Sequence, residues 1–101
     1  MFFVQIDEAS RNYLKSLPSE ERHDGQAILR AITERGCGFL KKAVNKHGYN
    51  LDGCYYAYFG GTKHRIVAEQ VSASEVVIWS IGPREQFEVY RDAQNKRNPE
   101  K

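Results

Sequence analysis

The chain is poor in the residues that mark several specialised classes of protein. Its 101 residues include two cysteines, Cys37 and Cys54, and no pair of cysteines or histidines at zinc-binding spacing. We therefore expect reduced thiols and no metal site. No apolar run approaches the length of a membrane span, and the apolar start of the chain turns polar at Asp7, too early for a signal peptide. These features favour a cytoplasmic protein without a cofactor.

Acidic residues are scarce in the middle of the chain. The net charge of the whole chain is only +2. Between Arg35 and Arg65, however, six basic residues stand against the single acid Asp52, a net charge of +5. Such a local excess attracts a polyanion. Each lysine taken singly is equally well explained as a solvated surface residue.

The residue pattern predicts one domain over residues 1–101, with a polar, frayed tail from 94 to 101. We expect a strand at 2–6, two helices that meet at Pro18 and end near residue 35, strands at 54–59, 64–71 and 76–81, and a helix from Pro83 to Ala93. The strand at 76–81 is predicted to be central and buried on both faces. The fold class is α+β: an N-terminal strand, an antiparallel helical hairpin packed on a twisted antiparallel sheet of about four strands, and a short C-terminal helix.

Side-chain alternation predicts which groups share a face of the sheet. Tyr56 and Tyr58 should lie on the face away from the helical hairpin, together with Arg65 of the next strand. Arg84 and Tyr90 follow the end of the strand at 76–81 and should reach the same open face. The sequence thus predicts a shallow cleft of two arginines and three tyrosines, edged by lysines.

This set of groups suits an RNA chain with unpaired bases. Arginine pairs with phosphate oxygens, and tyrosine rings stack on bases. The same groups could cleave RNA without a metal, if a base activates the 2′-hydroxyl and cations stabilise the transition state. Tyr90 could act as acid or base only if neighbouring cations lower its pKa.

Each of these residues also has a structural interpretation. Arg65 could pair with Glu69 on its own strand, and Arg84 with Glu88 at helical spacing. The tyrosines could instead form an aromatic face that binds a partner protein.

The order of these elements, with Arg65, Gly82 to Glu85, and Glu88 to Tyr90, resembles the RelE/ParE toxin superfamily. The resemblance covers residues 13 to 91. It implies the toxin of a type II toxin–antitoxin system, a ribosome-dependent mRNA endoribonuclease that acts by 2′-OH attack and is bound by a cognate antitoxin. By position it makes Arg65 a transition-state stabiliser, Arg84 a phosphate-binding residue or general acid, and Tyr90 a substrate-positioning residue. The residues expected to contact RNA are Tyr56, Tyr58, Lys41, Lys42, Lys46, His47 and Lys63.

The sequence departs from the RelE-like pattern at Tyr56 and Tyr58, where the ribosome-dependent members carry lysines. Lys63, His64 or His47 could substitute for those lysines. ParE-like members share the fold, lack the nuclease residues and inhibit DNA gyrase by protein–protein contact. Two alternatives therefore stay open: a gyrase inhibitor, and a non-catalytic binding module of the same fold.

Overall fold

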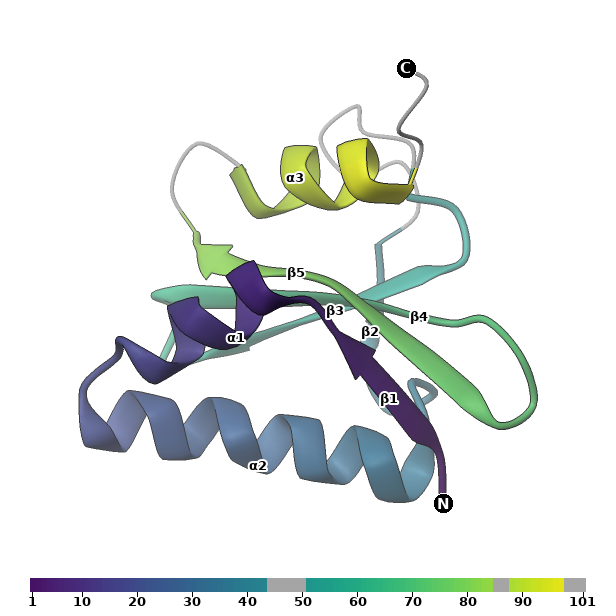
Figure 1. Ribbon diagram of the computed structural model, residues 1–101, viewed down its shortest axis with the longest axis horizontal. Helices are drawn as coiled ribbons and strands as arrows, with labels where there is room; N and C mark the ends of the chain where they lie inside the picture. Colours follow the sequence, from purple (N-terminus) through teal and green to yellow (C-terminus); the bar gives the residue numbers. More distant parts are fainter. Residues whose placement is uncertain (44–50, 85–87, 98–101) are drawn as a thin grey trace.

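The computed structural model describes residues 1–43, 51–84 and 88–97. Figure 1 shows the arrangement of the elements. In chain order these are β1 (Phe3–Ile6), α1 (Glu8–Lys15), α2 (Ser19–Arg35), β2 (Lys41–Lys42), β3 (Cys54–Phe59), β4 (His64–Gln70), β5 (Glu75–Pro83) and α3 (Glu88–Arg97).

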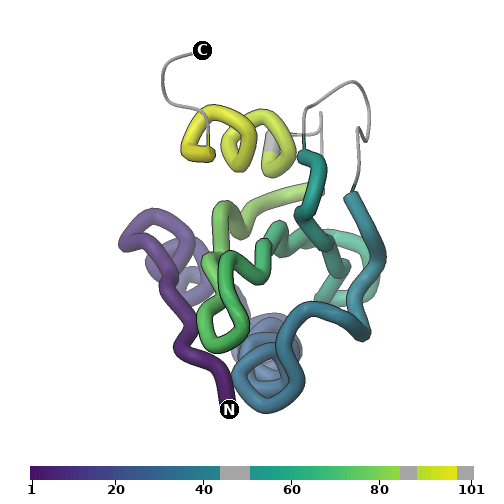
Figure 2. Tube along the Cα trace, turned by 90° about the vertical axis from the view of Figure 1, so that its right-hand side faces the viewer, coloured from purple at the N-terminus to yellow at the C-terminus, as the bar shows by residue number. Residues whose placement is uncertain are grey.

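The strands form one five-stranded sheet in the order β1-β5-β4-β3-β2. The strands β2 to β5 pair antiparallel, as expected, whereas β1 lies parallel to β5. The sheet is therefore mixed, and it gains a fifth strand at Lys41 and Lys42, in a stretch without any period in the sequence. Figure 2 shows the sheet between two helical layers, with α3 on one side and α2 on the other. The predicted α+β fold class is confirmed with these two differences.

Local signals explain the helical hairpin. Asp7 caps α1, and its Oδ1 accepts a hydrogen bond from the backbone N–H of Ser10 at 2.9 Å. Pro18 precedes the first residue of α2, where a proline cannot continue the preceding helix. At the other end, Gly36 adopts a φ of 77°, which favours glycine, and ends α2. The helical hairpin predicted from the sequence is confirmed.

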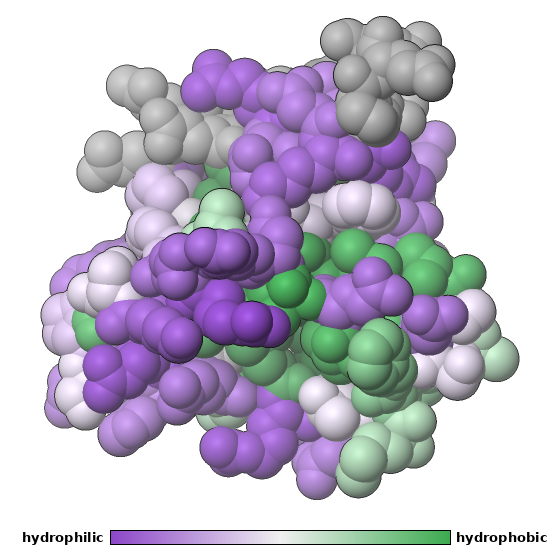
Figure 3. Space-filling model, viewed as in Figure 1, coloured by the Kyte–Doolittle hydropathy of each residue, from purple (hydrophilic) through white to green (hydrophobic). Residues whose placement is uncertain are grey.

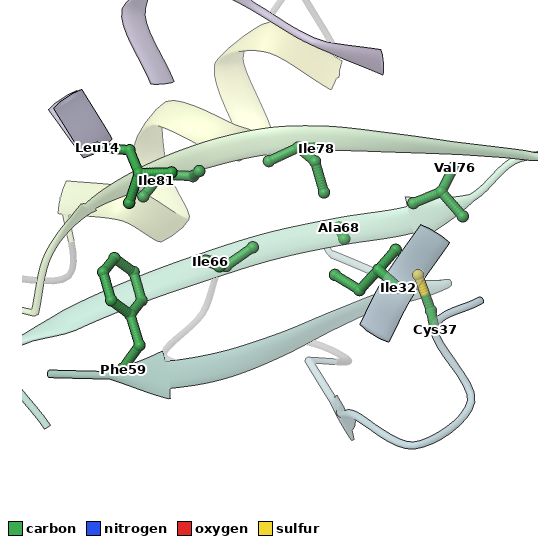
Figure 4. Close-up of a cluster of buried hydrophobic side chains, with 9 residues drawn as sticks. All are labelled: Leu14, Ile32, Cys37, Phe59, Ile66, Ala68, Val76, Ile78 and Ile81. Atoms are coloured by element: carbon green, nitrogen blue, oxygen red, sulfur yellow. The ribbon is translucent and has the colours of Figure 1, made fainter. Parts of the chain in front are cut away.

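Two apolar clusters occupy the two faces of the sheet. The cluster in Figure 4 lies between the hairpin and the sheet and includes Leu14, Ile32, Phe59 and Ile66. The second cluster lies between the sheet and α3. Its buried members are Ala43, Leu51, Cys54, Tyr56, Val67, Val89, Tyr90 and Ala93. The alternation predicted for β3 and β4 is confirmed, because Ile66 and Ala68 belong to the first cluster and Tyr56 and Val67 to the second.

The middle strand of the sheet and the two ends of the last helix differ from the prediction. The middle strand is β4, not β5, and its residues 64 to 68 are all buried. Pro83 ends β5, and α3 begins at Glu88, so Arg84 is not part of the helix. Residues 94 to 97, expected in a frayed tail, complete α3 because Lys96 and Arg97 form ion pairs with the rest of the protein.

The surface is polar over most of the face shown in Figure 3. Hydrophilic side chains cover the outer sides of α2 and α3, and a hydrophobic area lies on the side of β1 and the β4–β5 turn. Phe3, on the edge strand β1, is 64% exposed. Within the described residues, none of the helices is both long and apolar enough to cross a membrane.

Candidate functional site

Arg65 lies at the centre of an aromatic cluster on the α3 side of the sheet. Its register partner on the neighbouring strand β3 is Tyr58, whose hydroxyl accepts a hydrogen bond from Arg65 Nη2 at 3.3 Å. The guanidinium carbon lies 4.5 Å from the ring centroid of Tyr90 and 5.1 Å from that of Tyr58. Both distances are those of cation–π contacts. Tyr56 packs edge-on against the other two tyrosines. The predicted meeting of these four residues is thus observed.

Tyr56, Arg65 and Tyr90 of this cluster are buried and Tyr58 is half-buried, so the cluster is not the open cleft that the sequence predicts. Arg65 is 2% exposed, and Tyr90 is fully buried. The reason is α3, which packs over this face through Val89, Tyr90 and Ala93. Burial raises the pKa of the Tyr90 hydroxyl, and the neighbouring Arg65 charge does not outweigh that effect. With α3 in this position, Tyr90 stays a neutral phenol at neutral pH and cannot act as a general base.

Arg84 and Lys63 lie together at the adjoining end of the sheet. The backbone N–H of Arg84 donates to the carbonyl of Lys63 at 3.0 Å, and both side chains are exposed. Arg65 pairs with Gly82, two residues before Arg84. Two solvent-exposed cations therefore lie at the end of the sheet near which Arg65 pairs with Gly82. After the hydrogen bond from His64, the Lys63 charge also helps to lower the pKa of the Glu21 carboxyl of α2.

The predicted lysines divide between the two faces of the sheet. Lys41 pairs with Tyr56, so its side chain lies on the face of the aromatic cluster. Lys42 pairs with Tyr55, which packs on the helical hairpin, so the side chain of Lys42 lies on the other face of the sheet. Its contact with RNA stays a prediction. The predicted contacts Lys46 and His47 lie outside the described residues.

No pattern in the sequence indicates the ion pairs that hold α3 in place. Arg97 Nε donates to Glu69 Oε1 at 2.8 Å, and Trp79 Nε1 donates to the same oxygen at 3.0 Å. Burial alone would raise the pKa of Glu69, but these hydrogen bonds outweigh it and lower the pKa. Glu69 therefore binds Arg97 and Trp79, where the sequence suggested a pairing with Arg65.

A second pair of contacts fixes the other side of α3. Lys96 Nζ lies 2.6 Å from Asp7 Oδ2 and 2.8 Å from Asp92 Oδ2. Ser80 Oγ of β5 also donates to Asp92 Oδ2, at 2.7 Å. Hydrogen bonds from Lys96 and Ser10 outweigh burial and lower the pKa of Asp7. The helix that covers Arg65 is thus tied to β4, β5 and the start of α1.

His64, a possible substitute for the absent lysines, lies on the opposite face of the sheet and contacts the helical hairpin. Its Nε2 contacts Glu21, and its Nδ1 bonds the Tyr13 hydroxyl at 2.7 Å. Its ring packs on Phe59, and the residue is 7% exposed. His64 therefore joins the sheet to both hairpin helices and does not face the aromatic cluster.

The two cysteines are buried and do not extend the site. Burial raises the pKa of each thiol to about 11, so both are protonated at neutral pH. Within the described residues, no cluster of three histidine, cysteine or acidic side chains could hold a metal ion.

This architecture, a mixed sheet between a helical hairpin and a C-terminal helix, is the RelE fold. Among solved structures, a mutant of the E. coli toxin RelE in the free state is 23% identical with a TM-score of 0.68, covering 91% of this chain and 93% of that one. The isolated E. coli RelE toxin is 22% identical with a TM-score of 0.65, covering 92% and 95%. The RelE resemblance is thus confirmed at the level of the fold.

A third similar structure contains a partner. The intact E. coli RelBE toxin–antitoxin complex includes a chain that is 21% identical with a TM-score of 0.65, covering 85% of this chain and 100% of that one. No family profile matches the sequence. No curated protein sequence matches it at a significant level.

Proposed function

We propose that this protein is the toxin of a type II toxin–antitoxin pair and cleaves mRNA at the ribosome without a metal. The observation that carries the proposal is the convergence of Arg65, Tyr58 and Tyr90 from β4, β3 and α3. The RelE fold supports the same reading. A cognate antitoxin is the expected partner, by analogy with the E. coli RelBE complex.

The proposed reaction is an attack of a ribose 2′-oxygen on the adjacent phosphorus. The 2′-hydroxyl releases its proton to a water molecule as the 2′-O–P bond forms. The bond from phosphorus to the 5′-oxygen of the next nucleotide breaks, and that oxygen takes up a proton, so the products are a 2′,3′-cyclic phosphate and a 5′-hydroxyl. Arg65 stabilises the charge that develops on the phosphate oxygens, and Arg84 holds the phosphate or protonates the leaving oxygen. Tyr90 positions the substrate through its ring, whose centroid lies 4.5 Å from the guanidinium carbon of Arg65.

The proposal requires that substrate reach Arg65. Because Arg65 is 2% exposed, its guanidinium must become accessible through a movement of α3 or of the tyrosines beside it. Arg84 and Lys63 are already exposed and would make the first contact with the phosphate chain. Binding and cleavage would then be separate steps that depend on different arginines.

The test is to express wild-type protein and Arg84→Ala in bacteria and to map new RNA 5′ ends. Wild type should arrest growth and cut inside translated frames, and Arg84→Ala should lose both effects at unchanged thermal stability. Arg30→Ala is the matched control, since Arg30 is an exposed arginine on α2, in the opposite layer. Full toxicity of Arg84→Ala would overturn the assignment of this residue.

A ParE-like action on DNA gyrase is the second candidate. It is favoured by Tyr56 and Tyr58, which supply no positive charge, and by the burial of Arg65. Growth arrest with intact mRNA, together with loss of gyrase supercoiling in a purified assay, would support this function. Arrest with neither effect would point to another protein target, and an absence of arrest would point to a non-catalytic binding module.

A further inference from the structure

A crevice of about 270 Å³ opens at the edge of the sheet where β2 begins. Phe39, Leu40 and Lys41 line one side of it, and Tyr56, Ala57 and Tyr58 line the other. Tyr58 is also the residue that bonds Arg65. The crevice is therefore directly next to the candidate site.

The crevice exists because β2 is shorter than the strand beside it. Within the described residues, β2 pairs with β3 only at Tyr55 and Tyr56. The chain before β2 turns away, since the backbone N–H of Leu40 bonds the carbonyl of Cys37. The strand β3 continues to Phe59.

The backbone of β3 offers hydrogen-bonding groups to this crevice. The carbonyl of Cys54 accepts from Ala43, so it points to the β2 side. Backbone direction alternates along a strand, so the N–H and C=O of Tyr58 point to the same side, beyond the last β2 pair. Within the described residues these two groups of Tyr58 have no β2 residue opposite them, so a bound molecule could accept a hydrogen bond from the N–H and donate one to the C=O.

The walls of the crevice combine an exposed ring with positive charge. Phe39 is 44% exposed, and the guanidinium carbon of Arg35 lies 5.7 Å from its ring centroid. Arg35, Lys41 and Lys42 are exposed, and residues 35 to 43 include no acid. A flat apolar ring among cations fits a nucleobase attached to a phosphate chain better than it fits an apolar peptide.

We propose that this crevice is a subsite for one unpaired nucleobase of the RNA substrate. The base stacks on Phe39 and hydrogen-bonds the backbone of Tyr58, while Lys41 and Arg35 neutralise the neighbouring phosphates. Because Tyr58 is shared with Arg65, the bound base belongs to a nucleotide next to the one that is cut. This inference rests on the proposed function and names the part of the RNA that the site recognises.

The test measures binding of the protein to ribosomes loaded with a fluorescent 2′-O-methyl mRNA, which lacks the attacking hydroxyl and is not cleaved. Phe39→Ala should weaken binding between about five- and 150-fold, the effect of losing one stacked base. Phe39→Trp should restore binding. Phe3→Ala is the matched control, because Phe3 is an exposed phenylalanine at the opposite edge of the sheet, and it should bind like wild type.

The outcomes separate this inference from the proposed function. Wild-type affinity in Phe39→Ala, or no binding by wild type, would overturn the subsite, while cleavage that depends on Arg84 would still support the nuclease. If Phe39→Ala binds RNA normally but loses its antitoxin, the crevice is a protein-docking surface and the subsite is wrong. In the cellular 5′-end map, Phe39→Ala should also flatten the base preference at one position beside the cut.

Discussion

Arg97 fastens the C-terminal end of the helix that covers Arg65. Its Nε donates to Glu69 Oε1 at 2.8 Å, its Nη2 lies 3.3 Å from Glu69 Oε2, and Nη2 also bonds the carbonyl of Asp52. These contacts join α3 to β4 and to the turn before β3. Arg97→Ala removes all of them and leaves Glu69 with the hydrogen bond from Trp79. We predict that α3 then opens more often.

The size of the change in the opening equilibrium of α3 follows from the kind of contact that is lost. A hydrogen bond to a charged group contributes roughly 1.5 to 3 kcal/mol where it is shielded from water. Both side chains are about one-fifth exposed, so solvent screens the pair in part, and we expect one such contribution and not the sum of three. The opening equilibrium of α3 should therefore rise by about 10- to 150-fold.

Hydrogen–deuterium exchange measures this opening directly. Amides in α3 should exchange faster in Arg97→Ala by that factor, while amides in β4 and β5 keep their protection. Arg91→Ala, an exposed arginine on the same helix, should leave exchange unchanged. An equal loss of protection in all elements would mean that α3 does not open separately, and no loss would mean that Arg97 does not fasten it.

Two further predictions concern pH and packing. The pKa of Glu69 is lowered in the folded protein, so its stabilising contribution is present above the unfolded value of about 4.3 and is lost as pH falls through the lower, folded value. The emission of Trp79 should therefore shift only below the unfolded pKa, and Glu69→Gln should abolish that shift. Gly25→Ala places a Cβ 2.9 Å from the Phe59 ring, so denaturant unfolding should show a loss of about 1 to 2 kcal/mol, whereas Gly38→Ala, in open space, should be neutral.

The faces of the strands could be predicted because alternation is a local property. Tyr56, Tyr58 and Arg65 lie where the two-residue period places them. The helical hairpin could be predicted as well, since Pro18 lies directly before α2 and Gly36 directly after it. These features depend on residues a few positions apart.

The exposure of the site could not be predicted in the same way. Whether Arg65 is open to solvent depends on α3, and α3 is held by the pairs Arg97 with Glu69 and Lys96 with Asp7. Glu69 and Arg97 are 28 residues apart, a separation at which no sequence period brings them together. The sequence also suggested a helix from Pro83, although β5 continues through that residue. Residues 94 to 97 were predicted as a frayed tail because they are polar, but a polar composition is also found at the end of a helix that packs on the protein.

The position of Tyr90 restricts how the proposed site can open. Tyr90 belongs to α3, so a complete departure of that helix would expose Arg65 and remove the ring that packs on it. If cleavage needs both residues, substrate must enter beside Tyr58 while α3 stays docked, and Arg97→Ala should weaken toxicity. If cleavage needs Arg65 alone, the same variant should increase toxicity, because the arginine is uncovered more often. The direction of the change in growth arrest therefore decides whether α3 is part of the site or its cover.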